Sequence, residues 1–294
     1  MTTTAVLFPG QGAQRPRMLH DLPPEGRAVL DEASRVLGED TDTLDTDQSL
    51  AGTRGTQLAL LLAGTAWHRA ARAAGMSADY LAGHSLGLWT AAVAADALDL
   101  ADAVALVDLR ARAMAASAPP SSGMLAAQGV GPAAVEALTA ELRALGHQVW
   151  AANTNGCAQV TASGTDEALD LLTARLPALG ARRVVRLPVA VPAHCPLMAP
   201  AAQQVADALS LVEIRRPRVP VAGNLTGQTL FDAGRLRTEL SAGMTRGVRW
   251  STAVQVLAER GVTRWIQAPP GRDLLDFGRL PGQAVPARIC PTGP

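Results

Sequence analysis

The chain is 294 residues long, 48% of its residues are apolar, and its 26 basic and 26 acidic residues give a net charge of zero. A chain of this length can bury a large core, either as one domain or as a domain with an insertion. This composition excludes a disordered tail and a polybasic nucleic-acid-binding protein. Every basic residue of the Lys and Arg class is arginine, so lysine-based chemistry such as a Schiff base is excluded as well.

The three cysteines, Cys157, Cys195 and Cys290, lie far apart and lack the spacing of a metal site. Their odd number and the length of the chain argue against a disulfide framework, and we expect no bound metal. The first nine residues lack the basic region and long apolar stretch of a secretory signal. The apolar run at residues 58–66 is too short to span a bilayer. We therefore expect a cytoplasmic protein without a membrane segment.

Short apolar runs alternate with helical stretches in the first part of the chain. Residues 5–8 form a run that Pro9 and Gly10 stop, which indicates a buried strand leading into a glycine-rich loop. A second buried strand is expected at residues 80–82. Helices are expected at residues 57–74, 88–97 and 102–117. This alternation predicts an α/β core with a parallel sheet.

The middle of the chain has a different order of elements. Strand, helix, strand, strand, helix and strand are expected at residues 124–130, 132–145, 148–152, 159–162, 166–179 and 183–191. This β-α-β-β-α-β order is the split pattern of a ferredoxin-like module. We therefore predict that residues 1–122 and 192–294 form the α/β core and residues 123–191 a small inserted subdomain. The tail from Pro281, rich in Pro and Gly, is expected to be irregular.

Residues 83–87 read GHSLG and match the motif G-x-S-x-G. An expected strand precedes the motif and a helix follows, which places Ser85 on a sharp turn with its hydroxyl at a helix N-terminus. The two glycines permit the turn, and the free amide of Leu86 could donate to an oxyanion. The alternative is a chance match in a chain rich in Ala and Gly. The strand-turn-helix context favours Ser85 as a nucleophile.

A nucleophilic serine needs a base, and the chain has five histidines. His20, His68 and His147 are expected at surface or boundary positions. His84 adjoins the serine, but adjacent side chains on a sharp turn point apart, so it is expected to shape the turn. His194 follows a strand between two prolines, and rigid placement of this kind suits a general base. A merely structural turn histidine is an equal alternative at this position.

A second glycine-rich loop follows the first strand, with the sequence FPGQGAQ at residues 8–14. It matches neither the Walker pattern nor G-x-G-x-x-G, which argues against a phosphate cradle. The amide of Gln11 could supply the second donor to an oxyanion. Taken by itself, the loop favours a simple strand-to-loop turn.

Arg110 falls within an apolar stripe of the helix expected at residues 102–117. The residues that share this stripe by i, i+3 and i+4 spacing are Ala103, Leu106, Val107 and Met114. A guanidinium there must be paired, because an uncompensated buried charge is costly. It could pair with a structural Asp or Glu, or bind a substrate carboxylate in a bidentate manner.

Taken together, these motifs resemble the blocks of the malonyl-CoA:acyl carrier protein transacylase family, which includes the acyltransferase domains of polyketide synthases. The blocks occur in the family's order: FPGQGAQ at 8–14, GHSLG at 83–87, LVDLRARAM at 106–114, ANTNGCAQVTASG at 152–164, VPAHCPLM at 191–198 and PPG at 269–271. The resemblance covers nearly the whole chain. It implies an α/β-hydrolase-like core with a ferredoxin-like insert.

The resemblance also implies a role for each candidate residue. Ser85 would be the nucleophile and His194 the base, while the amides of Gln11 and Leu86 would hold the oxyanion. Arg110 would bind the malonyl carboxylate. The substrate would be the coenzyme A thioester malonyl-CoA and the partner an acyl carrier protein, with no permanently bound cofactor.

Some residues depart from the fatty-acid-synthesis members of that family. Leu88 stands where an acidic residue usually follows GHSxG. Backbone carbonyls orient the histidine in the family, and one is expected near residues 248–250, where Arg249 replaces the common Gln. The stretches GQGAQRPRMLHDLP, LDEASRVLGED and VLAERGV with PPG resemble the epsilon subunit of malonate decarboxylase, which moves malonyl to a carrier-protein thiol. A fatty-acid or polyketide transacylase is the alternative.

Two rivals come from other functional classes. A serine acyl hydrolase would use the same serine and histidine but let water reach the acyl-enzyme, and the sequence does not exclude it. A non-catalytic interaction module is disfavoured, because Ser85, His194 and Arg110 are all present.

A carrier protein is usually acidic, so a basic face is expected. Two groups of arginines could form it: Arg182, Arg183 and Arg186, or Arg215, Arg216 and Arg218. A solvated arginine face without a partner is an equal alternative, since runs of charge are weak indicators.

Overall fold

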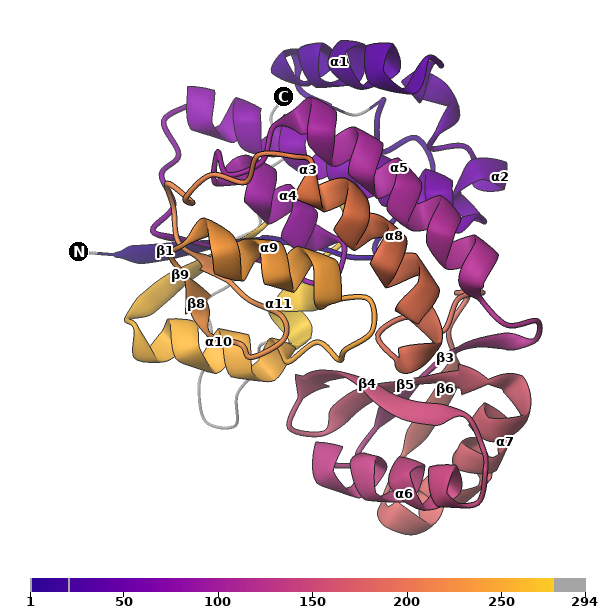
Figure 1. Cartoon of the computed structure of the whole chain (residues 1–294). Coiled ribbons are helices and arrows are strands. Elements are labelled where there is room, and N and C mark those ends of the chain that lie inside the picture. The colour runs from indigo at the N-terminus through magenta and orange to yellow at the C-terminus, as the bar shows by residue number, and fades with distance from the viewer. Residues whose placement is uncertain (1, 21, 278–294) are drawn as a thin grey trace.

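The computed structural model describes residues 2–20 and 22–277. Its elements fall into two sheets with separate helical coverings, and the mixed α/β class is as predicted (Figure 1). The irregular tail expected from Pro281 lies outside the described residues.

A mostly parallel sheet forms the centre of the larger part. Its strands, in spatial order, are β8 (Thr229–Leu230), β7 (Val221–Ala222), β2 (Tyr80–Gly83), β1 (Thr3–Phe8) and β9 (Val262–Gln267). β1 pairs in parallel with β2 on one side and β9 on the other, and β7 extends the parallel pairing from β2. β8 alone runs antiparallel, against β7. Strands buried on both faces read as continuous apolar runs, which is why residues 5–8 give a clear signal.

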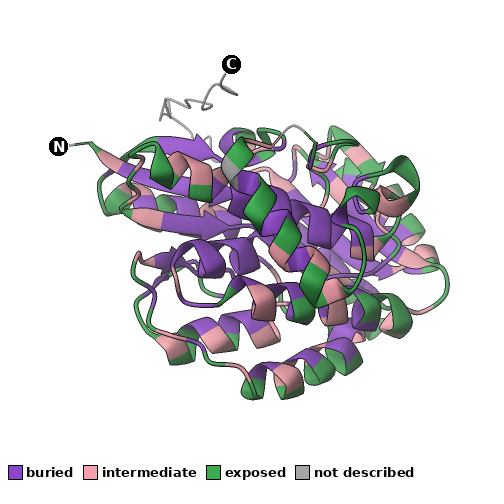
Figure 2. Cartoon of the chain, turned by 90° about the horizontal axis from the view of Figure 1, so that it is seen from above, coloured by how far each residue is buried: buried purple, intermediate pink, exposed green. Residues whose placement is uncertain are grey.

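Helices cover both faces of this sheet. They are α1 (Arg27–Leu37), α2 (Asp47–Leu50), α3 (Thr53–Ala73), α4 (Gly87–Ala94), α5 (Leu100–Ser117), α8 (Ala199–Ser210), α9 (Ala233–Ala242), α10 (Trp250–Glu259) and α11 (Asp273–Phe277). Short 3₁₀ turns occur at Pro24–Gly26, Thr41–Thr43, Leu176–Leu179 and Pro196–Met198. Figure 2 shows buried residues gathered on the strands and the inward sides of the helices, with the exposed residues facing outward. α3 and α4 are buried along most of their length.

The second sheet is antiparallel. β3 (Ser122–Gln128), β4 (Val149–Gly156), β5 (Gln159–Thr165) and β6 (Arg183–Arg186) lie in the order β4-β5-β3-β6. α6 (Pro132–Ala144) and α7 (Asp166–Arg175) pack together and cover its outer face (Figure 1). This chain order and strand order are those of a ferredoxin-like module, as predicted. The proposed domain boundaries at residues 122/123 and 191/192 stay a prediction.

Several elements end earlier or start at other residues than expected, and the backbone gives the reasons. β3 ends at Gln128 because Gly129 adopts a positive φ of 93°. α4 ends at Ala94, where Asp96 turns the chain with a φ of 55°. β6 ends at Arg186, and Pro188 follows, which has no N–H for a strand ladder.

Candidate active site

Ser85 sits on a sharp turn between β2 and α4. Its φ is 54°, in the left-handed region of backbone conformation that residues other than glycine rarely adopt. The glycines on either side leave no room for a side chain. A Cβ on Gly83 would lie 2.0 Å from the Gly87 carbonyl, and one on Gly87 would lie 2.0 Å from the Phe8 oxygen. The motif therefore has the strand-turn-helix context that the sequence predicted.

The structure brings Ser85 and His194 together across 109 residues of sequence. The serine Oγ lies 2.7 Å from His194 Nε2. His194 Nδ1 lies 2.7 Å from the Gly243 oxygen and 3.2 Å from the Arg246 oxygen. Carbonyl oxygens only accept, so Nδ1 carries the proton and Nε2 is free to accept one from the serine. This arrangement is that of a nucleophile with its general base.

Burial sets the charge of this histidine. His194 is 4% exposed. Desolvation lowers the pKa of His194 to about 3, with smaller effects in the same direction from the positive charge of Arg110 and from His84. The hydrogen bonds to the Gly243 and Arg246 carbonyls raise the pKa, but by less. The imidazole is therefore neutral at physiological pH, as a base must be.

The orienting carbonyls correct one expectation. An orienting carbonyl is expected near residues 248–250, and the two that contact His194 belong to Gly243 and Arg246. The Val248 oxygen accepts from the Thr154 amide instead and ties the segment before α10 to β4. The Arg249 amide donates to the Asn224 oxygen. The contact thus comes from the loop that directly follows α9, a few residues earlier than expected.

Arg110 is buried beside this pair. It is 3% exposed and lines a small cavity with Ser85, His194 and Leu88. One guanidinium nitrogen donates to Gln57 Oε1, and Nε has no partner among the described residues. Burial lowers the pKa of Arg110 to about 10, so the group stays charged at neutral pH.

No Asp or Glu in the described part of the chain forms an ion pair with Arg110. The alternative of a structural carboxylate partner therefore has no support within residues 2–20 and 22–277. A buried cation without an anion is costly, and a bound carboxylate would relieve that cost. The arrangement suits a substrate that carries a negative charge close to its reacting carbon.

The glycine-rich loop after β1 packs against the serine turn. A Cβ on Gly10 would lie 2.5 Å from the His84 oxygen, so the backbones touch there. Within the described residues, the amides of Gln11 and Leu86 donate to no backbone carbonyl. Both are available to a developing oxyanion, and their role as its donors stays a prediction.

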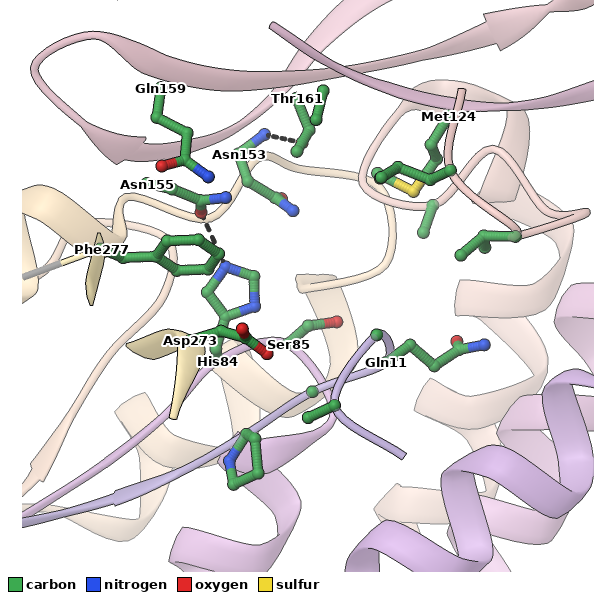
Figure 3. Close-up of a pocket in the computed structure, with 18 of the residues that line it drawn as sticks. Gln11, His84, Ser85, Met124, Asn153, Asn155, Gln159, Thr161, Asp273 and Phe277 are labelled. Atoms are coloured by element: carbon green, nitrogen blue, oxygen red, sulfur yellow. Dashed lines mark hydrogen bonds between the residues drawn. The ribbon is translucent and has the colours of Figure 1, made fainter. Parts of the chain in front are cut away.

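A cavity of about 350 Å³ opens over Ser85 between the two sheets. Figure 3 shows Asn153, Asn155, Gln159 and Thr161, from the antiparallel sheet, facing His84 and Ser85. The Asn155 oxygen lies 2.9 Å from His84 Nε2. His84 thus points away from the serine hydroxyl and ties the turn to the antiparallel sheet. Its volume lies in the range of ligand pockets, and the amide and hydroxyl side chains on one wall can hydrogen-bond a substrate.

Comparisons with known proteins agree with this geometry. The family model described as "Acyl transferase domain" matches residues 6–278. The malonyl CoA-acyl carrier protein transacylase of Escherichia coli K12 is 36% identical over 282 residues, covering 93% of this chain and 91% of that protein. Its counterpart in Bacillus subtilis is 32% identical, with coverage of 93% and 89%.

Solved structures give the same result. The malonyl CoA-acyl carrier protein transacylase of Coxiella burnetii superposes with a TM-score of 0.93 at 33% identity, covering 98% of this chain and 93% of that one. A malonyl-transacylase solved in complex with a type II PKS acyl-carrier protein has a TM-score of 0.90 at 34% identity, with coverage of 94% and 92%. The chain belongs to the acyl transferase family.

Several groups that build the site of this acyltransferase have no sequence signal. Asn224 Oδ1 accepts from the Ser85 amide at 2.8 Å, and Glu239 accepts from the Asn224 amide at 2.7 Å. A lone Asn after a two-residue strand resembles any loop residue. The carbonyls of Gly243 and Arg246 also give no sequence signal, because every residue has a backbone carbonyl.

Two further properties of this acyltransferase concern metals and membranes. Among the described residues, no group of three or more His, Cys, Asp or Glu side chains could hold a metal ion. In the same part of the chain no helix combines the length and apolar character needed to cross a bilayer. Cys195, which follows His194, is buried, and desolvation raises the pKa of its thiol to about 12. It is therefore an inert thiol at neutral pH.

Proposed function

We propose that the chain transfers malonyl from malonyl-CoA to the prosthetic-group thiol of an acyl carrier protein, through a malonyl ester on Ser85. The observation that carries this proposal is the 2.7 Å contact between Ser85 and a neutral His194, with Arg110, which forms no ion pair among the described residues, beside it. The relatives named malonyl CoA-acyl carrier protein transacylase support the same substrate and acceptor.

The first half-reaction forms the acyl-enzyme. His194 Nε2 takes the proton of Ser85 Oγ as the oxygen attacks the thioester carbonyl of malonyl-CoA. The amides of Gln11 and Leu86 hold the negative oxygen of the tetrahedral intermediate. The carbon–sulfur bond then breaks, and His194 returns the proton to the sulfur of coenzyme A. Arg110 holds the malonyl carboxylate throughout.

The second half-reaction reverses these steps with a different thiol. The carrier's thiol gives its proton to His194 and attacks the malonyl ester on Ser85. The ester bond to the serine breaks, and the serine oxygen recovers the proton. This scheme needs no permanently bound cofactor, because coenzyme A enters and leaves as part of the substrate.

The acceptor is proposed to be the carrier protein of malonate decarboxylase. Support comes from the stretches at residues 10–23, 30–40 and 256–262, which resemble its epsilon subunit, and from Leu88 after the serine motif. Leu88 is buried and lines the cavity beside Arg110. Transfer rates from the malonyl-enzyme to carriers of malonate decarboxylase, fatty-acid and polyketide systems test this assignment. A faster rate to either of the latter two would overturn it.

The central claim is tested by mass spectrometry of the intact protein. The native chain mixed with malonyl-CoA should gain the mass of one malonyl group, and a peptide containing Ser85 should carry it. The Ser85→Ala variant should gain nothing. A Ser85→Ala protein that still becomes malonylated would contradict the proposal. Loss of the label to water faster than to any carrier would favour a hydrolase.

A further inference from the structure

The Asn224 side chain holds the serine turn from the side of β7. Its Oδ1 accepts from the Ser85 amide at 2.8 Å, and its Nδ2 donates to the Gly83 oxygen at 2.7 Å. The two bonds flank His84 on the same edge of the chain. Asn224 is 4% exposed, so water does not compete for them.

These bonds continue a strand ladder beyond its end. β7 pairs in parallel with β2, with Val221 opposite Leu81 and Ala222 opposite Ala82. In a parallel pair, one residue bonds the N–H and C=O that lie on either side of its partner. The carboxamide of Asn224 makes the same two bonds around His84. It contains one acceptor and one donor, as a peptide group does.

Glu239 on α9 fixes Asn224 in turn. One carboxylate oxygen accepts from the amides of Asn224 and Leu225, at 2.7 and 2.9 Å. The contact is tight, since a Cβ on Gly223 would lie 2.4 Å from the other carboxylate oxygen. Glu239 is 4% exposed. A buried carboxylate that accepts two amide bonds holds a backbone segment firmly.

The same helix also leads to the base. The loop after α9 supplies the Gly243 oxygen to His194 Nδ1, and the Met244 oxygen accepts from the His194 amide at 2.8 Å. The charge of Arg246, whose oxygen also accepts from the ring, interacts with Glu239. α9 and the loop after it therefore hold both the serine turn, through Glu239 and Asn224, and the imidazole of His194.

The geometry points to Asn224 and Glu239 as positioning residues that hold the Ser85 turn at its productive distance from His194. This inference rests on the proposed function of Ser85 as the acylated nucleophile. The turn needs such support because Ser85 has a positive φ, a strained conformation that persists only when its surroundings impose it.

The test measures single-turnover acylation of Ser85 at several malonyl-CoA concentrations. Asn224→Leu has a similar volume and adds no charge, but it can neither accept from the Ser85 amide nor donate to the Gly83 oxygen. It should lower the limiting acylation rate by about 10- to 100-fold, since small displacements of reacting groups cost this much. The malonyl-CoA concentration for half-maximal rate should stay within about twofold, because neither residue is proposed to bind substrate.

Glu239→Gln is the milder variant and keeps the test valid if the Asn224 variant does not fold. Its neutral amide oxygen still accepts, more weakly, so the limiting rate should fall about 3- to 10-fold. In both variants, labelling of Ser85 by a phosphonate ester without a carboxylate should slow in parallel.

Arg237→Met is the matched control on the same helix. Arg237 donates to the carbonyls of Leu209 and Val212, away from the serine turn. Its loss should lower Tm but leave the limiting acylation rate unchanged. A wild-type rate in Asn224→Leu, or an equal loss in Arg237→Met, would overturn the inference. Failure of the wild-type chain to acylate at all would instead overturn the proposed function.

Discussion

Burial acts on two ionisable groups in the site, and it leaves one neutral and the other charged. Desolvation lowers the pKa of His194 to about 3 and that of Arg110 to about 10. At pH 7 the first change leaves the imidazole neutral, while the second still leaves the guanidinium charged. The same apolar surroundings therefore provide both a free base and a cation ready for a carboxylate.

The pH dependence of acylation follows from the histidine. A lowered pKa means that the neutral form persists as pH falls, until pH approaches about 3. We expect the rate of Ser85 acylation to stay nearly constant between pH 7 and pH 5, measured by rapid quenching and mass spectrometry. Arg110→Ala removes a neighbouring positive charge and should move the acid limb to higher pH. A wild-type rate that halves near pH 6.5 would show that His194 titrates as an ordinary histidine.

Arg110 should decide the choice of acyl group. Arg110→Ala leaves the malonyl carboxylate buried without a partner, so malonyl transfer should fall by about 100-fold or more, or about 3 kcal/mol. Acetyl transfer should change little, because acetyl has no carboxylate. Rates with malonyl-CoA and acetyl-CoA measure the ratio. Arg112→Ala, an exposed arginine on the same helix paired with Asp108, is the control. Equal losses for both acyl groups would make Arg110 structural.

The serine turn is built by the close approach of β1, β2 and α4. Gly10, Gly83 and Gly87 each leave no space for a Cβ, so the three backbones meet without side chains between them. The hydroxyl of Ser85 then projects at the start of α4. The two glycines of the motif are therefore required by backbone packing, whereas Ser85 supplies the hydroxyl.

Substitution of the second motif glycine separates packing from helix propensity. Gly87 is the first residue of α4, where alanine would otherwise favour the helix. Because its Cβ would strike the Phe8 oxygen, Gly87→Ala should lower the free energy of unfolding by about 2–3 kcal/mol and abolish acylation. Gly234→Ala on α9, whose Cβ has 3.5 Å to the nearest atom, should raise stability by about 0.5–1 kcal/mol. Urea unfolding measures both. A stable, active Gly87→Ala protein would contradict this packing.

The whole molecule places the two arginine groups at different distances from the site. Arg183 lines the cavity over Ser85. Residues 215–218 precede β7, so they lie near the amino ends of the parallel strands. Ser85 follows the carboxyl end of β2, at the other end of the same strands. Arg218 and Arg215 donate their amides to Ala95 and Ala97, past the far end of α4. A carrier that must deliver its thiol to Ser85 is therefore expected to dock beside Arg183.

Charge reversal distinguishes the two faces. Arg183→Glu should raise the half-saturating concentration of an acidic carrier by about 10-fold, because it replaces an attractive positive charge beside the cavity over Ser85 with a repulsive negative one. Arg216→Glu should change it by less than about twofold. The measurement uses preformed malonyl-enzyme, so that binding of coenzyme A does not contribute. Equal effects of the two variants would remove the proposed docking side.

By itself, the sequence determined the fold class and the ferredoxin-like order of the middle segment, and it singled out the candidate side chains of the site. Apolar runs and the β-α-β-β-α-β order carry the first two, because burial on sheet and helix faces repeats along the chain. Ser85, His194 and Arg110 stood out because a nucleophile, a base and a buried cation each need a particular side chain.

Only the tertiary structure decided what surrounds those side chains. The contact between Ser85 and His194 spans 109 residues. The carbonyls of Gly243 and Arg246 orient the imidazole, and backbone groups leave no mark in a sequence because every residue carries them. Asn224 likewise becomes part of the site only where β7 ends beside β2. The sequence specifies each side chain directly, whereas the backbone groups that position these side chains come together only when distant segments pack.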